Sequence, residues 1–385
     1  MMSETLRGTV ESIAPGGEGF FKQDGKSFFV GLSAPGDTIA FRVTEEHKSW
    51  ARGALLEVLS PGPGRVTPVC PCYGICGGCS LGHLSYESQI EAKKTILADS
   101  FLHIGKIFQL PVIKVTSGQP FEYRNRARLH VDGNALGFKA RGSGAIVPLG
   151  DCPACVPELR RFLARAAETP LPRGAAEITL YARNGTLLRE GGQRRGKITF
   201  LDKDLSVDCG LFFQSNGALL ERLITALREA AARVDEGLPL ADLYCGVGTF
   251  AAFLGERFSG GPRPAVTLVE ANKSALALAC ENCAAFPLEA AAQDCGTWAR
   301  AHDLSRYGMV VCDPPRQGLS AGLAAALAER GPRLLAYVSC NPASLARDAA
   351  ILRAGGFFLD SLGFFDFYPH TAHIEALALF TRDAA

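Results

Sequence analysis

The chain has 385 residues, of which 47% are hydrophobic and 21% charged, a composition typical of a folded protein with two or three hydrophobic cores. Its net charge of +1 excludes a globally basic protein, so a nucleic-acid partner would have to bind a local basic surface. Charged Glu4 and Arg7 interrupt the N-terminal segment, and no apolar run reaches the roughly 18 residues of a membrane helix. We therefore expect a cytoplasmic protein with no signal peptide and no membrane partner.

Residues 1–60 form the first predicted unit. Short β-type runs at 28–30, 38–43 and 54–58 alternate with Pro-Gly and Asp-Gly turns, a pattern that predicts a small all-β barrel. Four phenylalanines of this segment could stack on bases, but most are explained more simply as core residues. They are Phe20, Phe21, Phe28 and Phe29.

A cysteine-dense loop follows the linker at 61–64. Thirteen cysteines in a chain expected to be cytoplasmic favour metal binding or catalysis over disulfides. Cys76 and Cys79, with Cys70 six residues before Cys76, can surround one metal centre, and Gly77 and Gly78 free backbone amides to bond sulfur. The fourth thiolate must come from elsewhere in the chain, and Cys152 or Cys155 can supply it. Four thiolates suit zinc or an iron-sulfur cluster, and spacing does not separate the two.

The remainder of residues 61–208 predicts a helix capped by Ser85 and running to about 102, and then a β-rich domain. That domain includes strand-like runs at 126–131 and 177–181 and one helix over about 157–167. Arginines at every second position share one face of a strand, which predicts an RNA contact; they are Arg124, Arg126 and Arg128. Further basic residues could extend this stripe: Lys139, Arg141, Arg194, Arg195 and Lys197.

Residues 209–385 alternate Ala- and Leu-rich helical stretches with buried strand-like runs at 240–243, 265–269, 309–312 and 334–338. This alternation predicts a Rossmann-like domain, in which helices flank a parallel sheet. After the first run, Gly246 and Gly248 let backbone approach a ligand, but Ala251 stands where a dinucleotide site would need a third glycine. Glu270 ends the second run and can accept both ribose hydroxyls of a nucleoside cofactor. Asp294 follows a strand expected at 290–293, where the adenine edge would lie.

Asp313-Pro314-Pro315-Arg316 follows the fourth strand, at the end where open α/β sheets bind ligands. The two prolines stiffen the loop and hold Asp313 and Arg316 in place. Enzymes that methylate amino groups carry an aromatic residue after the Pro-Pro pair. Arg316 at that position therefore disfavours amino-group methylation.

Cys340 is the expected nucleophile, because an apolar run at 334–338 delivers it into the turn that begins with Asn341-Pro342. Carbon 5 of uracil is too weak a nucleophile to accept a methyl group unaided, and addition of a thiolate to carbon 6 activates it. A base must then remove the carbon 5 proton. Glu375, which opens a final apolar strand, is the first candidate, and His373 is its rival.

These residues together resemble the RNA uracil-5-methyltransferase family, and its iron-sulfur members acting on 23S ribosomal RNA more than its cluster-free transfer-RNA branch. The most specific motifs span 212–216, 313–316, 339–342 and 373–375. The resemblance covers nearly the whole chain. It implies a TRAM-like barrel over 1–60, a cluster loop and central RNA-binding domain over 61–208, and a methyltransferase domain over 209–385.

The resemblance implies S-adenosyl-L-methionine (SAM) and a 4Fe-4S cluster as cofactors. The implied SAM contacts are Gln214, Tyr244, Thr249, Glu270, Asp294 and Asp313. The implied cluster ligands are Cys70, Cys76, Cys79 and Cys152, with Cys72 and Cys155 as extra cysteines that leave the first and fourth ligands open to exchange. Cys340 is the implied nucleophile and Glu375 the implied proton acceptor.

We therefore expect a monomeric enzyme that methylates carbon 5 of a uridine in 23S ribosomal RNA. A transfer-RNA uridine methylase and a cytosine methylase are the alternatives among enzymes. An iron-sulfur RNA-binding or redox-sensing protein with an inactive methylase domain is the alternative of another class. An inactive domain would have no need of Cys340, Asp313 and Glu375 together, which weighs against that alternative.

Overall fold

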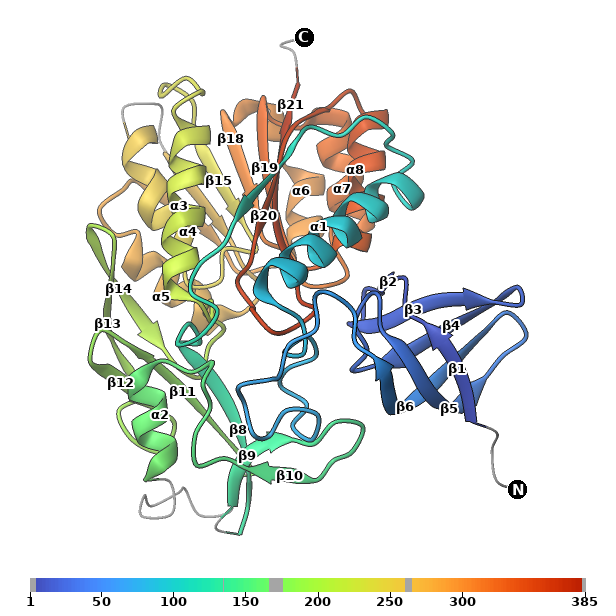
Figure 1. The fold of residues 1–385 in the computed structure, drawn as a ribbon. Coiled ribbons are helices and arrows are strands. Elements are labelled where there is room, and N and C mark those ends of the chain that lie inside the picture. Colours follow the sequence, from blue (N-terminus) through green and yellow to red (C-terminus); the bar gives the residue numbers. More distant parts are fainter. Residues whose placement is uncertain (1–4, 134, 166–175, 260–264, 383–385) are drawn as a thin grey trace.

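The computed structural model describes residues 5–133, 135–165, 176–259 and 265–382. Figure 1 shows three parts along the chain: an N-terminal β-rich part in blue, a central β-rich part in green, and a larger C-terminal α/β part in yellow to red. No helix among the described residues is long and apolar enough to span a membrane.

The N-terminal part is one six-stranded sheet in the order β1-β5-β6-β4-β3-β2, antiparallel except for the β4–β6 pair. Its strands are β1 (Thr5–Thr9), β2 (Ser12–Ile13), β3 (Glu18–Gln23), β4 (Lys26–Gly31), β5 (Thr38–Glu46) and β6 (Trp50–Ser60). Phe21, Phe28 and Phe41 are buried against one another, as core residues should be. Phe20 and Phe29 pair on the less buried face.

The central part has a five-stranded antiparallel sheet in the order β10-β9-β8-β11-β12, covered by α2, and a separate β13–β14 pair. Its elements are β8 (Arg126–Asp132), β9 (Ala135–Lys139), β10 (Ile146–Pro148), α2 (Pro157–Ala164), β11 (Glu177–Arg183), β12 (Thr186–Arg189), β13 (Arg195–Phe200) and β14 (Lys203–Asp208). The last residues of the helix predicted over 157–167 lie outside the described ranges.

The C-terminal part is built on an eight-stranded sheet in the order β17-β16-β15-β18-β19-β21-β20-β7. Neighbouring strands are parallel from β17 to β19, and β21 is antiparallel to both β19 and β20. Its strands are β7 (Ile113–Thr116), β15 (Leu240–Leu243), β16 (Val266–Val269), β17 (Leu288–Ala291), β18 (Met309–Cys312), β19 (Leu334–Ser339), β20 (Phe358–Phe365) and β21 (Glu375–Thr381).

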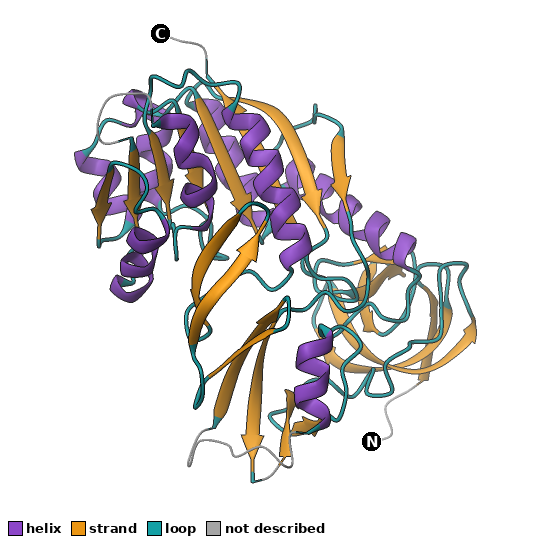
Figure 2. Cartoon of the chain, turned by 90° about the vertical axis from the view of Figure 1, so that its left-hand side faces the viewer, coloured by secondary structure: helices purple, strands orange, loops and turns teal. Residues whose placement is uncertain are grey.

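Helices cover both faces of this sheet (Figure 2) because successive residues of each strand point to opposite sides. Met309 and Val311 enter one core, and Val310 and Cys312 enter the other. The first core includes α3 (Gly217–Ala231), α4 (Thr249–Leu254), the 3-10 turn η2 (Gly255–Phe258) and α5 (Lys273–Asn282). The second includes α1 (Tyr86–His103), α6 (Cys295–Ala301), the 3-10 turn η3 (Leu304–Arg306), α7 (Ala321–Arg330) and α8 (Pro342–Ala354).

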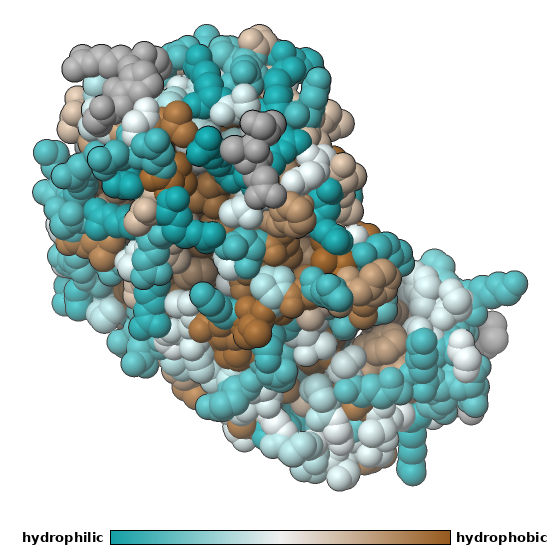
Figure 3. Space-filling model, turned by 90° about the horizontal axis from the view of Figure 1, so that it is seen from above, coloured by the Kyte–Doolittle hydropathy of each residue, from teal (hydrophilic) through white to brown (hydrophobic). Residues whose placement is uncertain are grey.

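Two elements that precede the central sheet in the chain pack with the C-terminal part. The strand β7 pairs in parallel with β20, and α1, capped by Ser85 as predicted, packs against α8. Figure 1 shows both in cyan and teal beside the red strands. The segment 61–208 therefore contributes to three different sheets. Seen from above (Figure 3), apolar side chains gather over the larger body, and the outlying N-terminal part is mostly polar.

Candidate active site

Cys340 lies at the carboxyl end of β19, where the chain turns into α8. Asn341 caps this helix by accepting a hydrogen bond from the Ala343 amide (3.0 Å), and Pro342 fills its first turn. The Asn341 side-chain amide also donates to the Arg316 carbonyl oxygen (2.8 Å), which joins the turn to the loop after β18. The two loops that carry Cys340 and Arg316 are therefore held together at one edge of the sheet.

Burial and neighbouring charge keep the Cys340 thiol protonated at rest. Desolvation raises its pKa to about 11, the carboxylates of Glu375 and Asp313 contribute in the same direction, and Arg316 opposes them. Only a small fraction is thiolate at neutral pH, because the pKa lies several units above 7. A positive charge brought close to the thiol would increase that fraction.

Glu375 is the first residue of β21 and is only 2% exposed. Desolvation, followed by the charge of Asp313, raises the pKa of its carboxyl group well above the usual value. Its Oε1 atom has no hydrogen-bond partner among the described residues. Because its pKa is raised, the ionised form of this carboxyl group is a stronger base than an ordinary carboxylate and can accept a proton from a group placed beside it.

Gln214 and Asp313 form a second polar pair at the same edge of the sheet. The Gln214 side-chain amide donates to Asp313 Oδ2 (3.4 Å). Gln214 is only 7% exposed, and its buried Oε1 atom has no hydrogen-bond partner within the described ranges. Burial raises the pKa of Asp313 to about 7 and that of Asp242, on β15, to about 8. Such a set of buried acids suits a ligand that carries positive charge.

The turn after β15 has the backbone geometry of a ligand-binding loop. Tyr244 (φ 59°), Gly246 (φ 54°) and Gly248 (φ 77°) are all left-handed. A Cβ on Gly248 would lie 2.9 Å from the Ala279 Cα, so α4 and α5 pack closely only with glycine there. A Cβ on Gly246 would meet nothing within 4 Å, so this backbone faces open space.

Glu270 follows β16 and accepts from the Gly246 amide at Oε2 (3.1 Å) and from the Asn272 amide at Oε1 (2.7 Å). It therefore fixes the turn, and each oxygen keeps a lone pair for a ribose hydroxyl. Thr249 begins α4 just beyond the turn. The unpartnered Gln214 oxygen, the open backbone at Gly246 and the buried acids fit the amino group, nucleoside and sulfonium of SAM.

Asp294 lies at the same end of the sheet but already has a structural role. It is exposed and caps α6 by accepting from the Thr297 amide (2.9 Å). The strand before it is β17, at Leu288–Ala291, so the strand expected at 290–293 was placed two residues too late. The reason is that the alanines at 290–292 look alike in sequence, and only the pairing with β16 fixes the register.

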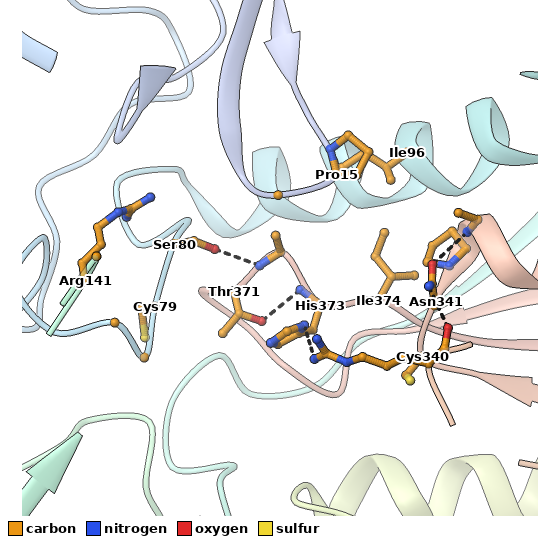
Figure 4. Close-up of a pocket in the computed structure, with 18 of the residues that line it drawn as sticks. Pro15, Cys79, Ser80, Ile96, Arg141, Cys340, Asn341, Thr371, His373 and Ile374 are labelled. Carbon is orange, nitrogen blue, oxygen red and sulfur yellow. Dashed lines mark hydrogen bonds between the residues drawn. The ribbon is translucent and has the colours of Figure 1, made fainter. Parts of the chain in front are cut away.

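A cavity of about 830 Å³ opens in front of Cys340, between the three parts of the molecule (Figure 4). The N-terminal sheet contributes Pro15, the cysteine loop contributes Cys79, and the C-terminal part contributes Arg316 and His373. Arg141, from the loop between β9 and β10, also lines it. A cavity of this size and position can admit a polymer segment with one base directed at Cys340.

The cysteine loop brings four thiols near one another. Charge on Cys152 raises the pKa of Cys70, Cys76 and Cys79, although burial is the larger cause for each. The Gly78 amide donates to the Cys76 sulfur (3.4 Å), as the paired glycines predicted. Among the described residues, no three His, Cys, Asp or Glu side chains lie close enough to hold a single metal ion.

Cys155 occupies a different position from Cys152. It is fully buried, and its thiol donates to the Cys152 sulfur, which lowers the pKa of Cys152 to about 6 and raises that of Cys155. Cys70, Cys79 and Cys152 line a partly open pocket of about 370 Å³. This arrangement favours Cys152 over Cys155 as the thiol that faces the pocket.

The arginine stripe is not one exposed surface. Arg126 and Arg128 are on β8, but Arg124 precedes the strand and lies close to Cys79, Cys152 and Cys155. Its guanidinium packs over the Phe138 ring, and its Nε is buried with no partner in the described part of the chain. The prediction of three arginines on one exposed face is therefore wrong: Arg124 and Arg126 are both half-buried, and of the three Arg128 is the exposed one.

Sequence reasoning missed the contacts that position the loop before Glu375. Ser80 donates its backbone amide to the His370 carbonyl oxygen (2.9 Å), and the His370 amide donates to the Gln89 side chain (2.7 Å). Lys93, on α1, donates to the Tyr368 carbonyl oxygen (2.9 Å). Nothing in the sequence showed that Lys93 is buried or which group it contacts.

Comparison with known proteins agrees with this geometry. A family model described as tRNA (Uracil-5-)-methyltransferase matches residues 203–383. The chain is 33% identical to the 23S rRNA (uracil(1939)-C(5))-methyltransferase RlmD of Chromohalobacter salexigens, over 97% of this chain and 89% of that protein. It is 31% identical to the RlmD protein of Alkalilimnicola ehrlichii, over 97% and 96% of the two chains. The chain belongs to the RNA uracil-5-methyltransferase family.

A member of this family is a methyltransferase that uses SAM and acts on RNA, which confirms the enzyme class expected from Cys340, Asp313 and Glu375. A solved structure shares the fold: the Pyrococcus abyssi tRNA (uracil-54, C5)-methyltransferase in complex with S-adenosyl-L-homocysteine. Its TM-score is 0.76 over 98% of this chain and 100% of that chain, at 24% identity.

Proposed function

We propose that this chain methylates carbon 5 of a uridine in 23S ribosomal RNA. The observation that carries the proposal is the meeting of Cys340, Glu375 and Asp313 at one edge of the C-terminal sheet, in front of a cavity large enough for a flipped base. The 23S ribosomal RNA activity named for the two RlmD relatives supports this RNA as the substrate.

The Cys340 thiolate would add to carbon 6 of the uracil ring. The sulfur–carbon bond forms as the carbon 5–carbon 6 π pair moves to carbon 4–carbon 5 and the carbonyl π pair moves onto O4. SAM supplies the methyl group that carbon 5 then takes. Glu375 removes the carbon 5 proton, the carbon 5–carbon 6 double bond re-forms, and the thiolate leaves.

The resting protonation states suit this sequence. Before SAM binds, mutual repulsion and burial keep protons on the Cys340 thiol and on the Glu375 carboxyl group. A sulfonium beside Asp313 and Glu375 favours their ionised forms, and its positive charge offsets the rise that these carboxylates cause in the pKa of Cys340. The cofactor charge would therefore prepare Glu375 as the base and limit the cost of forming the thiolate.

Six residues would hold SAM. Gln214 Oε1 and Asp313 would take the methionyl end, Tyr244 and Thr249 would flank it at the glycine turn, and Glu270 would accept the ribose hydroxyls. Asp294 would reach the adenine edge with the carboxylate oxygen that does not cap α6. This set of contacts predicts that a neutral thioether product binds less tightly than the sulfonium.

We propose that Cys70, Cys76, Cys79 and Cys152 hold a 4Fe-4S cluster, with Cys155 as the hydrogen-bond donor to Cys152. A cluster binds each thiolate at a different iron and so needs wider spacing than a single ion. The hydrogen bond from the Gly78 amide to the Cys76 sulfur, the pocket that Cys70, Cys79 and Cys152 line, and the nearby Arg124 cation support it. The bound cluster would supply rigidity and negative charge rather than a redox step, and through Ser80 it would position the loop before Glu375.

We further propose that residues 1–60 form a TRAM-like barrel, 61–208 the cluster loop and RNA-binding part, and 209–385 the SAM-dependent methyltransferase domain. Pro15 of the N-terminal part and Arg141 of the central part both line the cavity, which supports RNA contacts from both parts. We also propose a monomeric, cytoplasmic enzyme; residues from all three parts of one chain line the cavity in front of Cys340.

The decisive experiment measures tritium release from carbon 5 of labelled uridine in unmodified 23S ribosomal RNA, with transfer RNA in parallel. We expect release from ribosomal RNA that is abolished in Cys340→Ala. Glu375→Gln should trap a methylated RNA–protein adduct that migrates slowly on a denaturing gel. Release from transfer RNA alone would overturn the choice of substrate, and undiminished release by Cys340→Ala would overturn the mechanism.

A further inference from the structure

His373 lies two residues before Glu375 in a geometry that fixes which of its nitrogens carries a proton. Its Nδ1 atom lies 3.3 Å from Nη2 of Arg316. A guanidinium can only donate, so Nδ1 must be the acceptor and its lone pair must be free of a proton. The ring proton of the neutral side chain is therefore on Nε2.

The surroundings hold the His373 ring in one orientation. Its backbone amide donates to Thr371 Oγ1 (3.2 Å), and the Tyr368 ring contacts it edge to face with centroids 5.6 Å apart. The side chain is exposed to the cavity that Cys340 also lines (Figure 4). Within the described residues, no side chain or carbonyl accepts a hydrogen bond from Nε2.

His373 is poorly suited to act as the base. Burial of the ring by the cavity walls, and then the Arg316 charge, lower its pKa to about 4. A histidine with a lowered pKa is neutral at pH 7 and holds an added proton weakly. What it offers instead, at all pH values above about 5, is one N–H on a side chain that lines the cavity.

The chemistry of uracil gives that N–H a target. When a thiolate adds to carbon 6, negative charge develops on O4. A donor at O4 binds the adduct more tightly than the ground state, and only such differential binding accelerates the step. Cytosine carries an amino group at this position. That amino group and the His373 N–H are both hydrogen-bond donors, so they cannot bond to each other.

We propose that His373 is a catalytic and specificity-determining residue that donates its Nε2 proton in a hydrogen bond to O4 of the target uracil. Arg316 is its positioning residue, because it holds Nδ1 as an acceptor. The inference rests on the proposed uridine methylation and adds to it the group that stabilises the enolate and rejects cytosine.

The test follows a 5-fluorouridine RNA, whose adduct cannot lose fluorine and accumulates, in single turnovers with His373→Ala, His373→Gln and the parent protein. Loss of one preorganised donor slows such steps by about 10²–10³-fold, so His373→Ala should form adduct that much more slowly. His373→Gln, which restores an N–H, should recover much of the rate. The parent should favour uridine over cytidine RNA, and His373→Ala should lose most of that preference.

Arg141→Ala is the matched control, since Arg141 lines the same cavity but comes from the central part of the chain. It should raise the KM for RNA without slowing the formation of adduct from bound RNA. Thermal melting and SAM binding of both His373 variants should match the parent, which separates loss of a donor from loss of folding.

Adduct formation on the 5-fluorouridine RNA at the parent rate in His373→Ala would overturn the inference. If the same variant also accumulated the methylated adduct on ordinary uridine RNA, His373 would be the base. Equal losses in the Ala and Gln variants would overturn the donor role. Failure of the parent protein itself to form adduct would instead refute the proposed function, so the two failures are distinguishable.

Discussion

The buried ion pair between Lys93 and Asp366 offers the sharpest test of how the catalytic loop is held. Both side chains are 0% exposed, their Nζ and Oδ1 atoms are 2.6 Å apart, and Asp366 Oδ2 has no partner among the described residues. Lys93 also donates to the Tyr368 carbonyl oxygen. One side chain of α1 thus anchors the segment that leads to His373 and Glu375.

Replacing Lys93 with Met keeps the length of the side chain but leaves the Asp366 carboxylate buried without a counter-charge. Removing one partner of such a pair costs about 3–5 kcal/mol. At roughly 2–4 °C per kcal/mol, the melting temperature should fall by roughly 6–20 °C.

Lys94→Met is the matched control, because Lys94 is exposed and pairs only with Glu91, three residues earlier in α1 (3.4 Å). It should change stability by less than about 0.5 kcal/mol. The double variant Lys93→Met/Asp366→Asn removes both charges and should regain most of the lost stability. Differential scanning calorimetry measures all four proteins. A loss in Lys93→Met no larger than in Lys94→Met would refute the reasoning, as would a double variant no more stable than Lys93→Met.

Three further predictions concern the nucleophile, the cluster and the cofactor turn. Burial and nearby carboxylates raise the pKa of Cys340 to about 11, so its alkylation by iodoacetamide should accelerate about tenfold per pH unit from pH 7 toward 10. Peptide mass spectrometry measures the rate. A rate that stops rising below pH 8 would contradict the raised pKa. Cys152→Ser should lose the iron and visible absorption of anaerobically purified protein, whereas Cys155→Ser should keep most of the iron; a colourless, zinc-loaded parent protein would remove the cluster proposal. Gly246→Ala should cost roughly 1–2 kcal/mol, the strain of a left-handed backbone at a residue with a Cβ. Gly248→Ala should weaken SAM binding and stability by more than this, because a Cβ on Gly248 would also meet the backbone of α5. Calorimetric titration with SAM compares the two variants.

Local chemistry made much of the site predictable. Two features of the site can be recognised within ten residues of sequence: a thiol between an apolar strand and a proline turn, and two glycines after a buried strand. The structure places Cys340, Gly246 and Gly248 at strand ends as that pattern predicted. The position of Glu375 was also readable, because it begins a clear apolar strand.

The sequence did not predict where each strand begins and ends, or which charged side chains are buried and what they contact. Arg124 looked like one member of an exposed stripe, yet it lies beside the cysteines because β8 begins only at Arg126. Cys152 and Cys155 looked equivalent in spacing. Burial and the direction of one S–H hydrogen bond distinguish them.

The sequence by itself determined the order of elements, the α/β character of residues 209–385, the cysteine-rich loop and the residue types of the reaction. These follow from periodicity and turn chemistry, which act over a few residues. Only the tertiary structure decided that α1 and β7 join the C-terminal part and that Lys93 meets Asp366. It alone also decided that Arg316 sets the tautomer of His373. Such pairings join residues far apart in the chain, and their energies depend on distances and burial that exist only after the sheets have packed.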